Sequence, residues 1–192
     1  MKPLIALLSL SAGALWSYKS LVIDDFTSAD GSSQVGGYWQ GFTDRVMGGR
    51  SDIQAGIIEL DGRRVLRMEG DVTLENNGGF VQVRLPLDSG RNGISPENYR
   101  GIRIRYSVNR GSGFYVHLRT TGNRLPWAYF GALIPDAQAG AGEQVAEIPW
   151  EAFKGEMTAL KRLRPANLSS IAVVAAYEPG RVSIDVFHIE LY

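Results

Sequence analysis

The sequence contains no cysteine and only two histidines among its 192 residues. The missing thiols exclude disulfide bonds, thiol catalysis and cysteine-ligated zinc or iron–sulfur clusters. Lysine and arginine equal aspartate and glutamate, at 20 each, so the formal net charge is zero. A neutral chain with interspersed charges gives no electrostatic basis for binding nucleic acid or an anionic membrane surface. We therefore expect no nucleic-acid partner.

The sequence also lacks an apolar run of about 20 residues, the length that a transmembrane helix needs. A shorter apolar run, Leu4 to Leu10, precedes the small residues Ala12-Gly13-Ala14. This order resembles a short signal peptide with its cleavage site. We expect 1–20 to be such a signal or, alternatively, a flexible N-terminus, and 21–192 to form one domain. An exported location, periplasmic or extracellular, is slightly favoured over a cytoplasmic or membrane-associated one.

Catalytic and cofactor-binding motifs are missing too. The sequence has no Gly-x-Ser-x-Gly elbow, no phosphate-binding glycine loop after a strand, and no spacing of histidine and carboxylates that suggests zinc. His188 lies in the last expected strand and is interpreted as structural. Aspartates offer oxygen ligands for calcium, but their spacing matches no known calcium loop. We therefore expect a protein that is not an enzyme and uses no cofactor and no metal.

What the sequence does have is a series of short segments bounded by turn residues. Apolar and polar side chains alternate over 80–85, 102–106 and 114–119, the pattern of half-buried strands. Asp61-Gly62 lies between two further strand-like runs and predicts a hairpin. The run 171–177 is almost wholly apolar, which is typical of a strand buried on both faces.

The other expected elements are short. Further strands are expected at 21–23, 127–133 and 182–192. The last of these changes its inward face near Val186, which predicts a bulge. One helical turn is expected at 149–153, a short helix at 158–164, and a hairpin turn at 109–113. About ten strands without a long amphipathic helix indicate an all-β sandwich or barrel.

The densest motif is the stretch 39–51, which begins at Trp39. It combines the charged pair Asp44-Arg45 with Met47 and the adjacent glycines Gly48-Gly49. Glycines allow backbone angles that side chains forbid, or the close approach of another segment. These residues either form a contact surface or anchor a loop onto the core, because aromatic residues are more often buried in cores than placed at sites.

This motif is similar to the signature of the complex I intermediate-associated protein family, the NADH:ubiquinone oxidoreductase assembly-factor domain. Two later blocks, 76–84 and 148–153, support the resemblance, which covers 21–192. It implies a jelly-roll β-sandwich resembling galactose-binding-like domains. It also implies a non-catalytic chaperone or assembly factor that binds protein partners such as respiratory-complex subunits. The residues that would form or shape its binding surface are Trp39, Asp44, Arg45, Met47, Gly48, Gly49 and Phe80.

A second candidate site is the outward face of the expected strand 114–119. Alternation places Tyr115, His117 and Arg119 on the same side of this strand. Arg84 and Gln82 would extend the face if their strand lies nearby, and Trp127 or Tyr129 would add an aromatic platform. Aromatic rings beside planar hydrogen-bonding groups suit a sugar or a peptide segment. The alternative function is therefore an extracytoplasmic carbohydrate-binding module, and the competing interpretation is a solvated sheet face.

Overall fold

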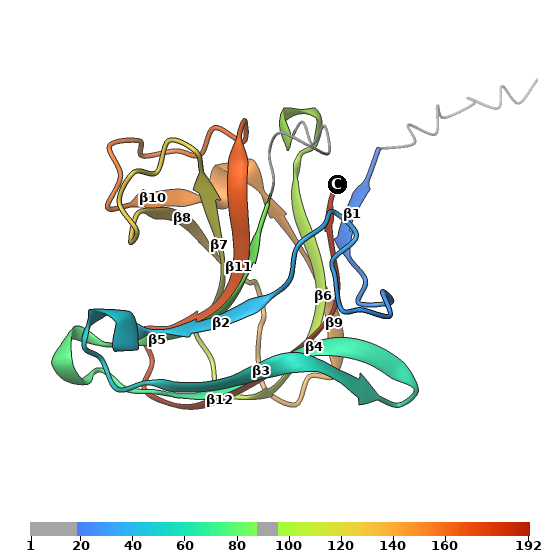
Figure 1. Cartoon of the computed structure of the whole chain (residues 1–192), viewed down its shortest axis with the longest axis vertical. Coiled ribbons are helices and arrows are strands. Elements are labelled where there is room, and N and C mark those ends of the chain that lie inside the picture. The colour runs from blue at the N-terminus through green and yellow to red at the C-terminus, as the bar shows by residue number, and fades with distance from the viewer. Residues whose placement is uncertain (1–18, 88–95) are drawn as a thin grey trace, which may run out of the picture.

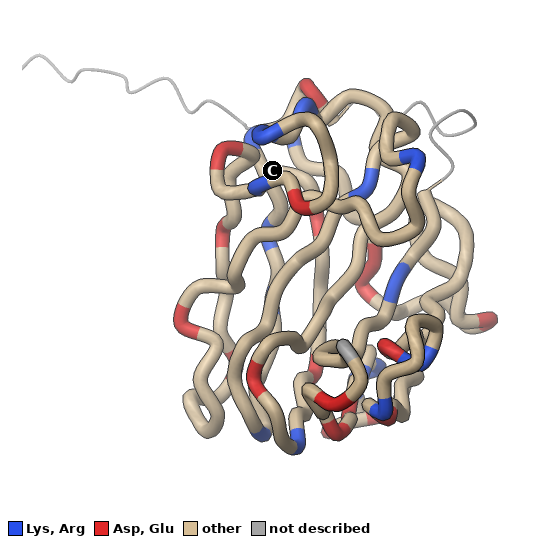
Figure 2. The backbone as a smooth tube through the Cα atoms, turned by 90° about the vertical axis from the view of Figure 1, so that its left-hand side faces the viewer, with Lys and Arg blue, Asp and Glu red and all other residues tan. Residues whose placement is uncertain are grey.

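The structure is a computed structural model that describes residues 19–87 and 96–192. It is a jelly-roll β-sandwich of two antiparallel sheets (Figure 1), which confirms the expected fold class. The signal peptide expected at 1–20 falls almost entirely outside the described residues. Within them, no helix has both the length and the apolar character needed to cross a membrane. Basic and acidic residues are dispersed over the whole fold (Figure 2).

The first sheet, named sheet A here, has the strand order β3-β4-β12-β6-β9, with β1 paired to β12. Its strands are β1 (Leu21–Asp24), β3 (Asp52–Leu60), β4 (Arg63–Val72), β6 (Gly101–Arg110), β9 (Glu143–Pro149) and β12 (Gly180–Leu191). The hairpin between β3 and β4 turns at Asp61 and Gly62, whose φ angles of 51° and 74° fit a two-residue turn. The register of β12 shifts between Val186 and His188, so the predicted hairpin and bulge are both confirmed.

The second sheet, sheet B, has the order β10-β8-β7-β11-β5-β2. Its strands are β2 (Gln40–Thr43), β5 (Phe80–Pro86), β7 (Phe114–Thr120), β8 (Tyr129–Leu133), β10 (Lys154–Glu156) and β11 (Leu168–Ala176). Strand β11 lies between β7 and β5 and is buried almost throughout, as its apolar sequence predicts. Four short 3-10 turns complete the described part of the chain: η1 (Asp44–Met47), η2 (Glu75–Asn77), η3 (Pro96–Asn98) and η4 (Trp150–Ala152).

The hydrophobic core fills the space between the two sheets. Alternate residues of each strand point into it, for example Val81 and Val83 of β5 and Ile102 and Ile104 of β6. Each large aliphatic side chain buried in this way stabilises the fold by about 1.5–3 kcal/mol. The opposite side of sheet B is turned away from this core. The second candidate site lies on that side.

Three expectations about local structure are wrong. Trp127 lies in the loop before β8, not in the strand. Residues 158–164 form no helix, because Met157 has a positive φ of 51° and Arg162 forms a β-bridge with Lys154. Residues 109–113 do not close a hairpin, since β6 belongs to sheet A and β7 to sheet B. The positive φ angles of Gly111 and Gly113 let the chain cross between the sheets there.

Candidate functional site

The signature stretch 39–51 is organised around the buried carboxylate of Asp44. The Ser51 backbone N–H donates to this carboxylate at 2.9 Å and the Ser51 hydroxyl at 2.5 Å. The Gly79 N–H donates at 2.6 Å, and the Phe80 N–H makes a longer contact of 3.4 Å. One side chain therefore links η1 to the start of β3 and the start of β5. These contacts join the two sequence blocks on which the family resemblance chiefly depends, 39–51 and 76–84.

The charge of Asp44 is stabilised by its hydrogen bonds. Burial alone would raise the pKa of this carboxyl, because a low-dielectric surrounding disfavours the ionised form. The hydrogen bonds from Ser51, Gly79 and Phe80 outweigh burial, and the pKa of Asp44 is lowered below its ordinary value of 3.8. Asp44 is therefore an ionised, fully hydrogen-bonded structural group at neutral pH.

The local sequence sets up this arrangement. The Thr43 hydroxyl accepts a hydrogen bond of 3.2 Å from the Arg45 N–H and so caps the start of η1. Gly48 ends the turn with a φ of 91°, an angle that suits glycine. Gly49 is needed for a different reason: a Cβ atom there would lie 2.3 Å from the Asp44 Cγ. Its backbone must approach the carboxylate more closely than a side chain permits.

We predict that the two glycines tolerate alanine very differently. Gly48→Ala meets nothing within 4 Å and should cost only the strain of a positive φ, about 1–2 kcal/mol. Gly49→Ala would displace the Asp44 carboxylate and should cost about 3 kcal/mol or more, since several buried donors lose their acceptor. Urea unfolding of both variants checks this. Equal losses would contradict the assignment of close approach to Gly49.

Of the other candidate binding residues in the signature stretch, two are exposed at the surface and one packs against the core. Arg45 and Met47 are exposed, and Arg45 donates to the Ser51 carbonyl at 3.0 Å and lies 3.5 Å from Asp52. Trp39 packs partly against the core, and its indole N–H donates to Asp24 at 2.8 Å. Whether the exposed members contact a partner stays a prediction.

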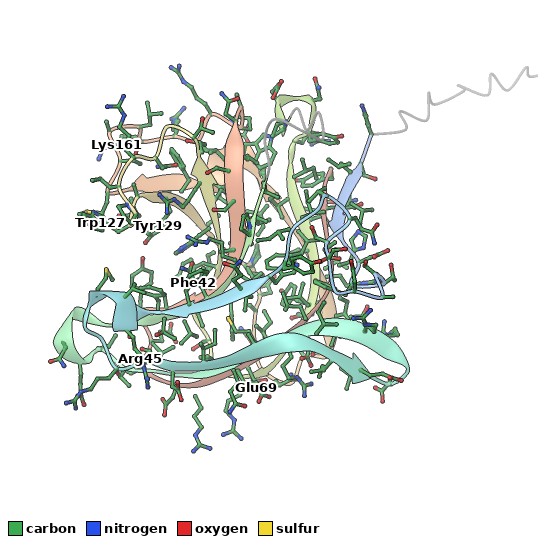
Figure 3. The ribbon with its side chains drawn as sticks, viewed as in Figure 1. Phe42, Arg45, Glu69, Trp127, Tyr129 and Lys161 are labelled. Carbon is green, nitrogen blue, oxygen red and sulfur yellow. The ribbon has the colours of Figure 1, made fainter. Side chains whose placement is uncertain are left out.

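The second candidate site lies on the side of sheet B that faces away from the core, which we call the open face. Strand pairing places Arg84 and His117 on either side of Ala172, and Gln82 and Tyr115 on either side of Val174. Figure 3 shows the neighbouring side chains from β2, from β8 and from the loop before β8: Phe42, Tyr129 and Trp127. The pairing thus brings together Arg84, Tyr115 and His117, as the sequence predicted.

Aromatic rings form a connected platform on this open face. The rings of His117 and Tyr129 stack with their centroids 3.9 Å apart and their planes 12° from parallel. The hydroxyl oxygens of Tyr129 and Tyr177 lie 2.5 Å apart, and the Tyr177 ring meets Tyr115 edge-on at 5.5 Å. Gly131 leaves room for the stack, because a Cβ atom there would lie 3.2 Å from each of the two stacked rings.

The platform is uncharged at neutral pH. Burial lowers the pKa of His117 to about 3, so its imidazole stays neutral. Burial also raises the pKa values of Tyr115 and Tyr129 above the ordinary 10.0 of a phenol. Arg84 adds a cation to the face, with its guanidinium 4.2 Å from the Phe42 ring centre. The face thus presents neutral rings with Arg84 beside them and Arg119 at the rim.

Arg119 organises the rim of the open face. Its guanidinium donates to the carbonyls of Leu125 at 2.8 Å and Pro126 at 2.7 Å, which fixes the loop that carries the exposed Trp127. Beside this loop a cavity of about 240 Å³ is lined mainly by apolar side chains, including Leu125 and Met157. Arg119 is therefore a positioning residue for this loop.

Exposed apolar side chains gather around the open face. Among the described residues, most of the large hydrophobic side chains that are exposed lie on this face or in loops that flank sheet B strands: Val46, Met47, Leu74, Leu125, Trp127, Leu133, Met157, Leu160 and Tyr177. Large exposed apolar patches mark interaction sites in soluble proteins. The open face and its rim therefore form one extended candidate binding surface.

Two members of this surface were missed from the sequence, Phe42 and Tyr177. Phe42 joins the face only because β2 pairs with β5, which sets it opposite Gln82. Tyr177 follows the end of β11 with a φ of 69° that returns its ring to the face. Neither the strand pairing nor the positive φ has a local sequence signal. In the described ranges, no group of three histidine, aspartate or glutamate side chains is placed to hold a metal ion.

Comparisons with solved structures show the fold. The chain resembles the family 11 carbohydrate-binding module of the cellulase Lic26A-Cel5E of Clostridium thermocellum, at 15% identity over 91% of this chain and 95% of that one, with a TM-score of 0.68. The same kind of module in complex with a β-1,3-1,4-mixed-linked tetrasaccharide matches at 14% identity, over 90% of this chain and 94% of that one, with a TM-score of 0.64. A family 30 module of the cellulase Cel9D-Cel44B of the same organism matches at 11% identity, over 91% of this chain and 97% of that one, with a TM-score of 0.54.

The sequence comparison identifies the family. No curated protein matches the chain. Residues 25–186 match the complex I intermediate-associated protein 30 (CIA30) family. This range contains both the residues that hydrogen-bond to Asp44 and the residues of the open face. The match spans most of the domain expected at 21–192. The chain therefore belongs to the complex I intermediate-associated protein 30 family.

Proposed function

We propose that this protein is a non-catalytic module that binds a partner protein through the open face of sheet B and acts as a chaperone or assembly factor. The observation that carries the proposal is the set of exposed aliphatic and methionine side chains around that face, such as Leu125, Leu133 and Met157. Protein interfaces favour aromatic residues, methionine and arginine at their centres. Aliphatic side chains offer no hydrogen bonds to a hydroxyl-rich sugar, so this rim favours a protein ligand.

Family membership supports the same class of partner. The family takes its name from association with intermediates of respiratory complex I. A subunit exposed in an unfinished complex presents apolar surface that its neighbours will later cover. The open face, with neutral rings and an apolar rim, is complementary to such a surface. We therefore propose respiratory-complex subunits as the partners.

A matched pair of variants tests the proposal. Leu133 on the open face and Val145 on β9 of sheet A have similar exposures, 56% and 60%. Leu133→Asp places a charge in the proposed interface and should lower recovery of respiratory-complex subunits with the protein by about tenfold or more. Val145→Asp should leave recovery unchanged. Quantitative mass spectrometry of affinity-purified protein from the native host measures both. Equal recovery with both variants would contradict the open face as the contact surface.

A carbohydrate ligand is the second candidate, and the aromatic platform favours it. Sugar rings stack on aromatic faces while planar polar groups bind their hydroxyls. The stacked pair His117–Tyr129 lies near Arg84 and Gln82, which supply such groups. A structurally similar family 11 module has been solved with a mixed-linkage tetrasaccharide. This likeness supports a sugar as the ligand of the same face.

An NMR titration distinguishes a carbohydrate ligand from a partner protein. The mixed-linkage β-1,3-1,4 tetrasaccharide is added at up to about 10 mM while the NMR resonances of the open face are followed. Saturable shifts at Tyr115 and His117, lost in Tyr129→Ala, would support the carbohydrate candidate. Unchanged spectra would exclude this sugar as a ligand of the open face and would leave binding of a partner protein as the proposed function.

A further inference from the structure

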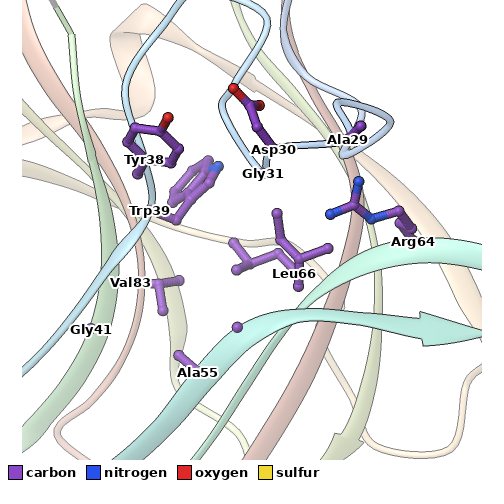
Figure 4. A pocket seen from close by; sticks show the side chains of 12 residues that line it. Ala29, Asp30, Gly31, Tyr38, Trp39, Gly41, Ala55, Arg64, Leu66 and Val83 are labelled. Atoms are coloured by element: carbon purple, nitrogen blue, oxygen red, sulfur yellow. The ribbon is translucent and has the colours of Figure 1, made fainter.

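A second cavity lies away from the open face, between the edge strands of the two sheets. It has a volume of about 240 Å³ and opens between β2 and β3, beside the loop that carries Asp30 (Figure 4). Its floor is formed by the core residues Leu66 and Val83, and Trp39 lines one side. Gly41 also lines it. Asp30 and Arg64 line it as well, so an apolar side chain entering the cavity meets the core at its floor and charged groups beside it.

Strand β3 borders this cavity and forms the end of sheet A. It pairs with β4 along its whole length, and the described residues include no strand hydrogen-bonded to its other edge. From Ile53 to Ile58 this strand carries no charged residue and no proline. Ala55 and Gly56 at its middle are exposed, and a Cβ atom at Gly56 would meet nothing within 4 Å. The free edge is thus accessible to another backbone.

The other sheet ends differ from β3 in ways that protect them. Strand β9, at the opposite end of sheet A, carries Glu143 and Glu147 in ion pairs with arginines and ends in Pro149. In sheet B, β2 has four residues and β10 has three. Charges, proline and short length are the usual means of preventing edge-to-edge pairing. Strand β3 has nine residues and lacks these protections along its middle.

The charges near the two ends of β3 distinguish between two candidate occupants of its free edge, a second copy of the chain and a segment of another protein. A second copy pairing antiparallel about Ala55 and Gly56 would set Asp52 of one chain opposite Glu59 of the other. Like charges directly opposite each other destabilise strand pairs. Glu59 has no ion-pair partner among the described residues, and Asp52 has only the exposed Arg45 at 3.5 Å. A strand with basic residues at both ends would instead complement these two carboxylates.

We infer that β3 binds an extended peptide segment of a partner protein by strand addition, with alternate apolar side chains entering the cavity beside Trp39 and basic residues meeting Asp52 and Glu59. This site lies on sheet A, apart from the open face, and goes beyond the proposed function. Backbone hydrogen bonds to β3 give the affinity, and the cavity selects the apolar side chain. An added strand of this length buries less than the about 1,000 Å² of a stable interface, so the contact is a weak, segmental one.

A synthetic peptide tests the inference. The probe is an eight-residue peptide of alternating valine and threonine with a lysine at each end, added to the ¹⁵N-labelled full chain at up to about 1 mM. We expect saturable shifts of the backbone amides of 55–60 and of the Trp39 indole N–H. Methylating alternate amide nitrogens of the peptide, or replacing its lysines by glutamates, should weaken binding by about tenfold or more, because pairing or charge complementarity is lost.

Variants of the protein locate the site. Gly56→Lys fits without a clash and places a like charge at the edge, so it should weaken peptide binding by about tenfold. Val145→Lys on β9 adds the same charge elsewhere and should leave binding unchanged, as should Leu133→Asp on the open face. Absence of shifts at β3, or shifts confined to the open face, would overturn the inference. Shifts at β3 that grow with protein concentration alone would show a second copy as the occupant and also overturn it.

Discussion

Replacing Asp44 by alanine should lower the free energy of unfolding by about 4 kcal/mol, because the Ser51, Gly79 and Phe80 donors would lose their buried acceptor. For a chain of this size, that loss lowers the melting temperature by about 10 °C. Calorimetry or urea unfolding measures the change. Asp52→Ala is the control, since Asp52 is exposed and pairs only with the exposed Arg45, and it should cost less than about 1 kcal/mol.

The pH dependence of the same variant gives an independent check. The pKa of Asp44 is lowered by folding, so its stabilising effect is complete above pH 3.8 and is lost as the pH falls through the pKa of the folded state. Asp44→Ala should remove this part of the acid sensitivity. If Asp44→Ala melts like the wild type and loses only its partner, Asp44 belongs to a contact surface and the structural assignment is wrong.

Mild acid should destabilise the protein through His117. In the unfolded chain this imidazole binds a proton below its ordinary pKa of 6.5, whereas in the fold burial holds the pKa at about 3. Between these values the unfolded chain binds one more proton, so stability falls as the pH falls. Because His117 is half-buried, we expect a loss of about 2 kcal/mol from pH 6.5 to about pH 4, less than the full shift implies.

The variant His117→Phe separates this effect from other titrations. Phenylalanine keeps an aromatic ring against Tyr129 but cannot bind a proton, so unfolding free energies of the variant should change little over the same pH range. Carboxyl groups titrate in both proteins, among them Asp44 with a lowered pKa and Asp24 with a pKa that burial raises, so the difference between the wild type and the variant isolates His117. An equally steep pH dependence in the variant would contradict a neutral, half-buried His117.

The elements that could be predicted from the sequence are those with a local cause. Asp61-Gly62 forms its hairpin because both residues accept positive φ angles. The apolar run 171–177, except for Tyr177, lies within the central strand β11 because such a run suits burial on both faces. The change of inward face near Val186 coincides with a shift of register in β12. Alternation also placed Tyr115, His117 and Arg119 on one side of β7, where the structure has them.

The features that could not be predicted depend on contacts between distant segments. Aspartate is usually exposed, and burial of Asp44 becomes favourable because Ser51 and the distant Gly79 both donate to its carboxylate. Phe42 reaches the open face through the pairing of β2 with β5, and Gly111 and Gly113 direct the chain from one sheet to the other. A glycine-rich turn carries the same local sequence signal whether it closes a hairpin within one sheet or connects strands of two different sheets.

Site-specific photocross-linking in the native host tests most directly whether the open face binds a partner protein. A photoreactive amino acid replaces Tyr177 on the open face or, as the control, Glu69 on the outer side of sheet A (Figure 3). We predict that position 177 gives a discrete adduct with a subunit of a respiratory complex and that position 69 does not. No protein adduct at position 177, or the same adducts at both positions, would contradict the account.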